Sequence, residues 1–399
     1  MLKTKTPDPA VRLGFLFAAI YMVSYITRIN YGAVISEMVR STGISKELLS
    51  LSLTGSFVTY GVGQVISGIA GDRLSPKKLV SIGFGVTAVM NLLIPLCGSP
   101  YTMLAVWCVN GFAQSFMWPP VVKMMSDMLS EEAYKRGMVI VSWGSSVGTI
   151  VVYLMVPAVI SLLSWKWVFV ISAAMAVITL VAWQWFTYRP APAAVAAVKE
   201  KGKAKHLFTP VMIGVMLAII LQGMLRDGVT TWMPSYISET YNLSTASSIL
   251  TGVILPIFSI LCFQLAARLY RKKLKNPVLC AGVFFGGGAV FAVGLYLCTG
   301  ANAAISVLFS ALLTGCMHGV NMMLISMVPN YFRRFGMAGT ASGVLNACTY
   351  IGSASSTYGI ALLSGVVGWE NTVLIWAGIA GLGTLVCLTG IKAWKRKFE

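Results

Sequence analysis

The chain has 399 residues, of which 57% are hydrophobic and only 11% are charged. Soluble domains carry about 25% charged residues, so this composition excludes a soluble enzyme and predicts a polytopic α-helical membrane protein. The net charge of +18 does not indicate nucleic-acid binding. The Lys and Arg residues lie in short segments between apolar runs and form no basic stripe with interleaved aromatic residues.

The apolar runs are each about 20 residues long, which is enough to cross a hydrocarbon core of ~30 Å. The bias of Lys and Arg between alternate loops places both termini in the cytoplasm. The segment MLKTKTPDPAVR leads straight into the first run without a cleavage site, so we expect no cleaved signal peptide. The twelve expected spans are 12–36, 47–70, 78–97, 100–126, 137–161, 164–188, 208–238, 245–268, 277–298, 302–328, 338–365 and 370–392.

One long polar connection interrupts this series. Residues 189–207, RPAPAAVAAVKEKGKAKHL, are dominated by Pro, Ala and Lys and are predicted to form a solvated cytoplasmic linker. The linker divides the chain into residues 1–188 and residues 208–399, each with six predicted helices. Two six-helix halves are typical of secondary transporters.

Two arginines lie deep in apolar spans, Arg28 in the first span and Arg226 in the seventh. They lie about 24 and about 27 Å from the cytoplasmic ends at 1.5 Å per residue, which are equivalent depths in the two halves. A buried guanidinium faces a cavity or a partner. Two of them could clamp a phosphate group, which carries about −1.5 to −2 charges at pH 7. The sequence therefore predicts one anion site.

The alternative is that each arginine forms a structural bridge with a nearby acid. Arg28 has no acidic residue within one turn. Arg226 is followed by Asp227, but neighbours in sequence point about 100° apart on a helix, which argues against pairing.

Polar and aromatic residues accompany both arginines at helical spacing. Interhelical hydrogen bonding is the alternative to ligand contact for each of them. They are Tyr21, Tyr25 and Tyr31 with Arg28, Tyr60 with Gln64, and Gln222 and Thr230 with Arg226, together with Asn110, Gln114, His318, Asn321, Asn346 and Tyr350.

The remaining titratable residues suggest little further chemistry. Lys123 and Asp127 are four residues apart and are expected to form a helical ion pair that reaches the membrane interface. Asp227 is the one acid that looks deep, which disfavours proton coupling. The eight cysteines lie in or beside apolar spans and are interpreted as packing residues. No nucleotide-binding loop, zinc-ligand spacing or nucleophile motif appears, so we expect no cofactor and no enzymatic activity.

Several motifs resemble those of a known transporter family. The segment G-x-x-G-D-R-x-x-P-K-K at Gly68–Lys78 resembles the loop signature of the major facilitator superfamily. Four further motifs resemble those of its organophosphate:phosphate antiporters, the family of glycerol-3-phosphate and hexose-6-phosphate transporters. These motifs are Y-x-x-R-x-N at Tyr25–Asn30, N-G-F-A-Q-S-F-M-W-P-P at Asn110–Pro120, R-D-G-V-T-T-W-M-P-S-Y-I at Arg226–Ile237 and A-G-T-A-S-G at Ala338–Gly343.

The resemblance implies an all-α major facilitator fold with twelve helices in two pseudo-symmetric halves. It implies alternating access by a monomer in the lipid bilayer of a bacterial inner membrane, with exchange of a phosphorylated metabolite for inorganic phosphate. In that family the arginines that match Arg28 and Arg226 hold the phosphoryl group. Family tyrosines around the site match Tyr21, Tyr25, Tyr60 and Tyr350.

Three residues depart from the family pattern, and taken together they leave less positive charge around the site. Gln64 stands where glycerol-3-phosphate-type members have a lysine, Ser145 where they have a histidine, and His318 where they have a tyrosine. The organic part of the substrate is therefore open. Two other functions also stay open: a symporter of an organic carboxylate driven by protons or sodium through Asp227 or His318, and a sensor that binds a sugar phosphate without transporting it.

Overall fold

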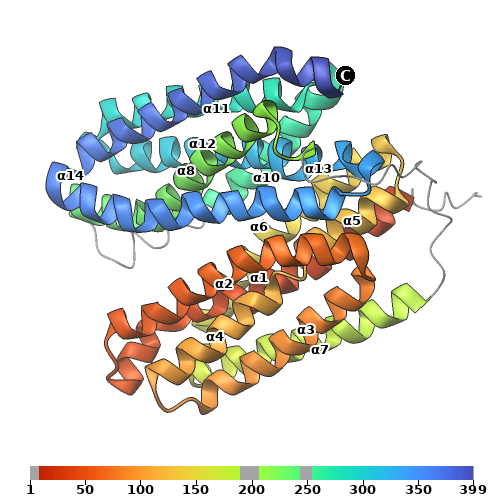
Figure 1. Cartoon of the computed structure of the whole chain (residues 1–399). Coiled ribbons are helices and arrows are strands. Elements are labelled where there is room, and N and C mark those ends of the chain that lie inside the picture. The colour runs from red at the N-terminus through yellow and green to blue at the C-terminus, as the bar shows by residue number, and fades with distance from the viewer. Residues whose placement is uncertain (1–8, 189–205, 243–253, 399) are drawn as a thin grey trace, which may run out of the picture. The chain divides into compact units, whose positions relative to one another are not determined.

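The computed structural model describes residues 9–188, 206–242 and 254–398. These residues form helices and connecting loops, and no strand occurs among them. The chain divides into two compact units (Figure 1). Unit 1 comprises Met1–Glu200 and Phe332–Gly343, and unit 2 comprises Lys201–Tyr331 and Val344–Glu399. Most of the predicted linker, residues 189–205, lies outside the described residues, so the linker stays a prediction.

The helices of unit 1 follow one another through short connections. Serine side chains at Ser45, Ser99 and Ser130 accept hydrogen bonds from the first turns of three of them, which satisfies N–H groups that have no partner within the helix. Helix α1 packs against α6 and α7, α2 against α4, and α3 against α7. The helices are α1 (Pro9–Thr42), α2 (Lys46–Arg73), α3 (Pro76–Leu93), α4 (Pro100–Gln114), α5 (Trp118–Met128), α6 (Glu131–Leu162) and α7 (Trp165–Tyr188).

The helices of unit 2 include two stretches of π-helix, Tyr270–Leu274 and Met322–Met327. The second stretch joins α12 to α13 without a break in the helical course. Helix α12 packs against α8, α10 and α11. The helices are α8 (Pro210–Tyr241), α10 (Ile254–Leu269), α11 (Pro277–Cys298), α12 (Ala303–Asn321), α13 (Val328–Tyr331) and α14 (Ala338–Phe398), whose first turns belong to unit 1.

Three expected spans differ from the helices in the structure. The span expected at 100–126 is interrupted at Ser115–Met117, between α4 and α5. The interruption precedes Pro119 and Pro120, and a proline supplies no N–H to the helix and clashes with the turn before it. The spans expected at 338–365 and 370–392 both lie within α14. Gly368, with φ of 77°, divides α14 into two helical segments, because glycine adopts positive φ without steric cost.

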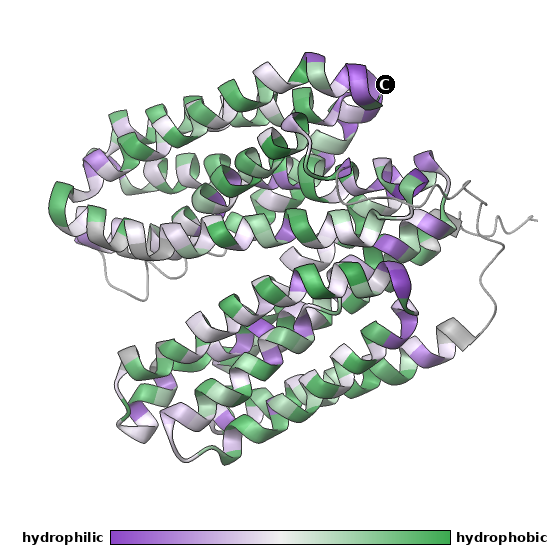
Figure 2. Cartoon of the chain, viewed as in Figure 1, coloured by the Kyte–Doolittle hydropathy of each residue, from purple (hydrophilic) through white to green (hydrophobic). Residues whose placement is uncertain are grey.

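Nine of the helical stretches in the described part of the chain are long and apolar enough to cross a membrane. Hydrophobic residues cover the length of most helices, and hydrophilic residues gather at helix ends, as at the C-terminal end of α14 (Figure 2). The predicted all-α membrane architecture is therefore confirmed. The count of twelve spans stays a prediction.

Asp72, at the end of α2, holds the first turn of α14 within unit 1. Its carboxylate accepts hydrogen bonds from the N–H groups of Gly339 at 2.9 Å and Thr340 at 2.6 Å. A helix N-terminus carries partial positive charge, so a carboxylate stabilises it. Burial raises the pKa of the Asp72 carboxyl, while the hydrogen bonds from Thr340 and Gly339 and the charge of Lys123 oppose that rise.

Candidate functional site

Arg28 lies in the middle of α1 with its side chain among aromatic rings. The residue is 6% exposed. Its guanidinium carbon is 4.3 Å from the ring centroid of Tyr25 and 4.6 Å from that of Tyr60 on α2. These distances fit cation–π contacts, which stabilise a desolvated cation. The structure thus brings together three of the residues predicted for the anion site.

Tyr21 extends this aromatic group by one turn of α1. Its ring lies 5.1 Å from that of Tyr25 and 4.7 Å from that of Trp118 on α5. Trp118 was not predicted as part of the site, although it lies in the Asn110–Pro120 motif. Gln64 is buried on α2, one turn beyond Tyr60.

Tyr31 was expected on the face of Arg28 but belongs to the core of unit 1. Its ring packs against Trp107 at 5.0 Å and Phe169 at 6.0 Å, and its hydroxyl donates to Ser52 Oγ at 3.1 Å. The aromatic group around Arg28 is therefore formed by Tyr21, Tyr25 and Tyr60.

A buried network of polar side chains holds α1 in place just before Arg28 in the chain. Gln114 on α4 accepts a hydrogen bond from Ser24 and donates one to Thr27 Oγ1, each at 2.7 Å. Asn110 donates to the carbonyl of Thr27 at 3.3 Å. Gln114 and Asn110 therefore make the interhelical hydrogen bonds that were the alternative interpretation of their role.

A second part of this network was missed in the sequence. Asn30 donates through Nδ2 to Asn91 Oδ1 on α3 at 2.8 Å and to Ser172 Oγ on α7 at 3.0 Å. The signal was available, because Asn91 is a buried polar residue within an apolar span, but its partner could not be identified from spacing alone.

Two glycines of α6 bring it against the helix that carries Arg28. A Cβ added at Gly144 would overlap the main chain at Ala18, and one at Gly148 would lie 2.9 Å from Tyr25 Cβ. The close approach fixes the position of Tyr25. Ser145, which replaces the family histidine, donates to the carbonyl of Ser142 at 2.9 Å.

The expected ion pair of Lys123 and Asp127 forms on α5. Lys123 is 5% exposed, so its side chain is enclosed by protein, and its reach to the membrane interface stays a prediction. Asp127 keeps 34% of its side chain exposed.

In unit 2, Arg226 pairs with its neighbour Asp227, which corrects the argument from helical angle. Arg226 Nε lies 2.7 Å from Asp227 Oδ1 and Arg226 Nη2 lies 2.8 Å from Oδ2. The long arginine side chain folds back toward the adjacent carboxylate, which the angle between Cα–Cβ bonds does not forbid. The bidentate geometry is the strong form of this interaction.

Close packing of α8 and α14 places Ser353 beside this ion pair. Added Cβ atoms at Gly223 and Gly352 would overlap the main chain at Thr349 and Ile220, respectively. Because these glycines let the two backbones touch, the hydroxyl of Ser353 reaches Asp227 Oδ2 and donates a hydrogen bond to it. Sequence analysis missed Ser353, which is one of several small polar residues on α14.

His318 approaches the same ion pair from α12. It interacts electrostatically with both Arg226 and Asp227, and its ring lies 5.4 Å from that of Phe263 on α10. Gln222 donates to the carbonyl of Met317 at 3.2 Å, which joins α8 to α12 at this level. Tyr350 lies on α14, three residues before Ser353, and is half-buried.

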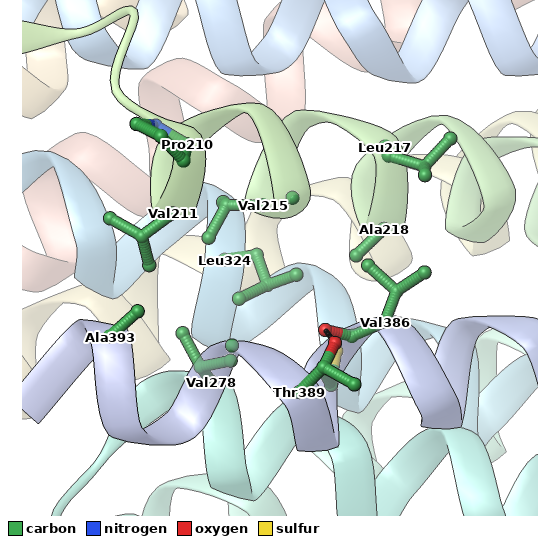
Figure 3. A pocket seen from close by; sticks show the side chains of 13 residues that line it. Pro210, Val211, Val215, Leu217, Ala218, Val278, Leu324, Val386, Thr389 and Ala393 are labelled. Atoms are coloured by element: carbon green, nitrogen blue, oxygen red, sulfur yellow. Dashed lines mark hydrogen bonds between the residues drawn. The ribbon is translucent and has the colours of Figure 1, made fainter.

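Unit 2 also contains an apolar cavity, which is separate from this group of residues (Figure 3). Its volume is about 380 Å³, and it lies between the first turns of α8, the start of α11 and the last turns of α14. No charged residue lines it. Burial of an anion in such surroundings is costly, so the cavity does not suit a phosphate group.

The comparison with family models decides the family. A model described as the Major Facilitator Superfamily matches residues 17–357. The chain belongs to this superfamily. The predicted family and fold class are thereby confirmed. The superfamily consists of membrane transporters and not of enzymes. Together with the apolar helices, this makes the chain an integral membrane protein.

Solved structures agree with the superfamily fold. The chain is similar to the proton:xylose symporter XylE, with a TM-score of 0.77 and 12% identity over 98% of each chain. It is also similar to FucP in the outward conformation, with a TM-score of 0.74 and 10% identity over 96% of this chain and 99% of the other. At these identities the likeness concerns the fold alone.

Several curated superfamily relatives cover most of the chain. It is 24% identical to the membrane sensor protein UhpC of Salmonella typhimurium, over 94% of this chain and 89% of the relative. It is 24% identical to the glycerol-3-phosphate transporter of Bacillus subtilis, over 90% and 85%. A probable hexose phosphate transport protein of Chlamydia muridarum is 22% identical, over 88% and 84%.

Proposed function

We propose that this superfamily member is a secondary transporter that exchanges a phosphorylated small metabolite for inorganic phosphate by alternating access. The observation that carries the proposal is a shielded arginine in each unit. Arg28 is buried among tyrosine rings, and Arg226, with 13% of its side chain exposed, lies in an ion pair. The names of the glycerol-3-phosphate and hexose phosphate relatives support a phosphorylated substrate.

In this proposal Arg28 and Arg226 bind the same phosphate group. Tyr21, Tyr25 and Tyr60 surround the group on one side, and His318, Tyr350 and Gln64 contribute polar contacts. Charge-assisted hydrogen bonds from two guanidiniums would bind a phosphate strongly. The two halves, residues 1–188 and 208–399, would rock against each other around the bound anion.

The charges of the two arginines and of the bound anion explain why we expect exchange. An anion bound by both arginines offsets the cost of bringing two cations together, so the ligand favours the closed state through which the carrier must pass. The empty carrier lacks this compensation, and its switching is expected to be slow. The protein would act as a monomer in a bacterial inner membrane, with both termini in the cytoplasm.

The test is counterflow in proteoliposomes that contain the purified chain. We expect labelled glycerol 3-phosphate or glucose 6-phosphate to enter vesicles loaded with phosphate and not vesicles loaded with sulfate. An uncoupler should leave this entry unchanged. Uptake that ignores internal phosphate and collapses with the uncoupler would contradict exchange and favour a proton-coupled carboxylate symporter.

Sensing is the second candidate, because one relative that covers most of the chain is a membrane sensor protein. A sensor would bind a sugar phosphate and yet give no counterflow. Binding is measured by the rise in melting temperature with ligand concentration. The melting temperature rises because the ligand binds the folded state and not the unfolded state. Binding without counterflow in oriented vesicles would replace the transporter proposal by the sensor.

A further inference from the structure

We propose that unit 2 binds an anionic phospholipid, with one acyl chain in the apolar cavity of Figure 3 and the headgroup at basic residues beside it. The cavity has a volume of about 380 Å³. It is formed by the first turns of α8, the start of α11, the π-helical stretch after α12 and the last turns of α14, all of which belong to unit 2. This site is separate from the proposed anion site, none of whose residues lines the cavity.

The walls of the cavity suit an acyl chain. Among the described residues that line it, none is charged and Thr389 has the only hydroxyl. Thr389 Oγ1 donates within its own helix, to the carbonyl groups of Leu385 at 3.1 Å and Val386 at 3.0 Å. An acyl chain therefore leaves this hydroxyl with its hydrogen bonds, whereas a polar ligand would lose its contacts with water. The buried part of the wall consists of Val211, Val215, Ala218, Val278, Leu324 and Cys387.

The cavity runs from the end of an apolar span into its interior. Its lining on α8 extends from Pro210 to Ala218, which is about 12 Å at 1.5 Å per residue. Pro210 is also the first residue of a span that is long and apolar enough to cross a membrane. On the open side of the cavity Leu217 is 43% exposed. An acyl chain extends in the same direction, from a headgroup at the membrane surface into the hydrocarbon core.

Gly214 leaves room on the α8 side of the cavity. It lines the cavity and is half-buried, yet a Cβ added there would meet no atom within 4 Å. On the opposite wall, a Cβ added at Gly390 would lie 3.5 Å from Val278 Cγ1, so α14 and α11 are in ordinary contact. The space next to Gly214 is thus space that the side chains of the protein do not fill.

Basic side chains of α14 lie where its lining of the cavity ends. Lys392 follows Thr389 by three residues and Arg396 follows Ala393 by three, so both basic residues lie on the face that lines the cavity. Both are exposed, and hydrophilic residues gather at this end of α14 (Figure 2). Lys395 is exposed as well but follows Ala393 by two residues, which places it on the opposite side of the helix.

Lys397 joins this end of α14 to the start of α8. Its Nζ donates to Thr209 Oγ1 at 2.6 Å and to the carbonyl of His206 at 3.2 Å. Thr209 directly precedes Pro210, the first cavity residue of α8. These hydrogen bonds place a further positive charge at the end of the cavity where α8 begins and α14 ends (Figure 3).

The segment before α11 contributes another basic residue beside the cavity. Asn276 Oδ1 accepts hydrogen bonds from the N–H groups of Val278 at 2.9 Å and Leu279 at 3.0 Å, which fixes the first turn of α11. Val278 lines the cavity, and the exposed Lys275 lies three residues before it, at most about 11 Å of main chain away. The long side chain of Lys275 can therefore reach a headgroup at the opening.

The acids in the described part of unit 2 lie far from this end of the cavity. Asp227 is 17 residues after Pro210, about 25 Å along α8, and Glu239 lies further on. Glu370 is 22 residues before Lys392, about 33 Å along α14. Basic residues between membrane helices at the lipid headgroup level attract anionic lipids, by about fivefold in affinity for each Lys or Arg. The charge beside the cavity therefore favours an anionic headgroup.

The experiment compares two phospholipids with identical acyl chains. Phosphatidylglycerol carries one negative charge, whereas phosphatidylcholine has no net charge. The purified full-length protein in detergent is titrated with each lipid, and native mass spectrometry measures the fraction of protein that carries one lipid molecule. We expect the wild type to bind phosphatidylglycerol at least about fivefold more tightly than phosphatidylcholine. Equal binding of the two lipids, or binding of neither, would overturn the proposal, and this comparison needs no variant.

Gly214→Leu tests the cavity, because its side chain fills the space that the acyl chain would occupy. We expect this variant to bind phosphatidylglycerol at least about tenfold more weakly than the wild type, and the smaller Gly214→Val to lie between the two. The matched control is Gly381→Leu on α14, at a half-buried glycine outside the cavity where an added Cβ also meets no atom within 4 Å. It should bind as the wild type does. Wild-type affinity of folded Gly214→Leu would contradict binding in the cavity.

Arg396→Gln tests the headgroup contact. We expect it to lower the preference for phosphatidylglycerol over phosphatidylcholine about fivefold and to leave the binding of phosphatidylcholine unchanged. Lys395→Gln removes the same charge from the opposite side of the helix and should keep the preference within about twofold of the wild type. Equal losses in the two variants would mean that the lipid responds to the overall charge of this end of α14, and would overturn the assignment of the headgroup to the cavity opening.

Discussion

Arg28 keeps its charge inside an apolar helix because aromatic faces replace part of its hydration. Its guanidinium carbon lies 4.3 Å from the ring of Tyr25 and 4.6 Å from that of Tyr60. The sequence predicted these three residues as neighbours from their spacing and motif. It did not predict that Arg226 binds Asp227, because the outcome depends on how a long side chain folds, which Cα–Cβ directions do not determine.

The aromatic contact predicts a specific response to substitution of Tyr60. Tyr60→Ala removes a cation–π contact of about 0.5–2 kcal/mol that holds the guanidinium of Arg28 in position, so the KM for phosphate exchange should rise about 2- to 30-fold. Tyr60→Phe keeps the ring and should stay within about twofold of the wild type. Equal losses in both variants would mean that the hydroxyl, and not the ring, carries the contribution of Tyr60.

At the scale of helices, tight glycine contacts determine which side chains meet. The glycines at 223 and 352 let α8 and α14 touch, and this contact places Ser353 at Asp227. Hydropathy and length predicted that the helices exist, because these properties belong to each helix alone. They could not predict the pair of helices in contact, because that depends on the partner surface. The interruption at Ser115–Met117 was missed although Pro119 and Pro120 lie just after it in the sequence.

Gly352→Ala tests this contact. The added methyl group overlaps the main chain at Ile220, so we expect a loss of about 1–3 kcal/mol in stability and a weaker hold of Ser353 on Asp227. Thermal melting and phosphate exchange should both decline. Gly378→Ala on the same helix is the control, since a Cβ there meets no atom within 4 Å. An alanine at 352 that behaves like the control would contradict the packing account.

Asp72 provides a second test at this scale. Asp72→Ala removes the acceptor of two N–H groups at the start of α14, and loss of such a cap costs about 0.5–2 kcal/mol. We expect a lower melting temperature for this variant, and a smaller drop for Asp72→Asn, which keeps an acceptor oxygen. The neighbouring Arg73 is exposed, so Arg73→Ala should melt as the wild type does. Equal melting of Asp72→Ala and Arg73→Ala would refute the capping role.

At the scale of the whole molecule, the two units resemble each other in one feature on which the proposed function depends. Each has apolar helices with an arginine near the middle of one of them, the buried Arg28 in α1 and the partly buried Arg226 in α8. Composition and span length predicted the all-α fold, because the membrane imposes these properties on the whole chain. The motifs predicted the superfamily. The charge balance of the site could not be predicted in the same way, because it depends on which acid reaches which arginine.

The most direct measurement is phosphate:phosphate exchange in proteoliposomes, with labelled phosphate outside and unlabelled phosphate inside. We predict exchange by the wild type and its loss in both Arg28→Lys and Arg226→Lys, because lysine cannot reproduce the bidentate hydrogen bonds of a guanidinium. Arg40→Lys, at an arginine of α1 with 79% of its side chain exposed, should exchange phosphate normally. Absence of exchange by folded, inserted wild-type protein, or full exchange by either the Arg28 or the Arg226 variant, would contradict the account.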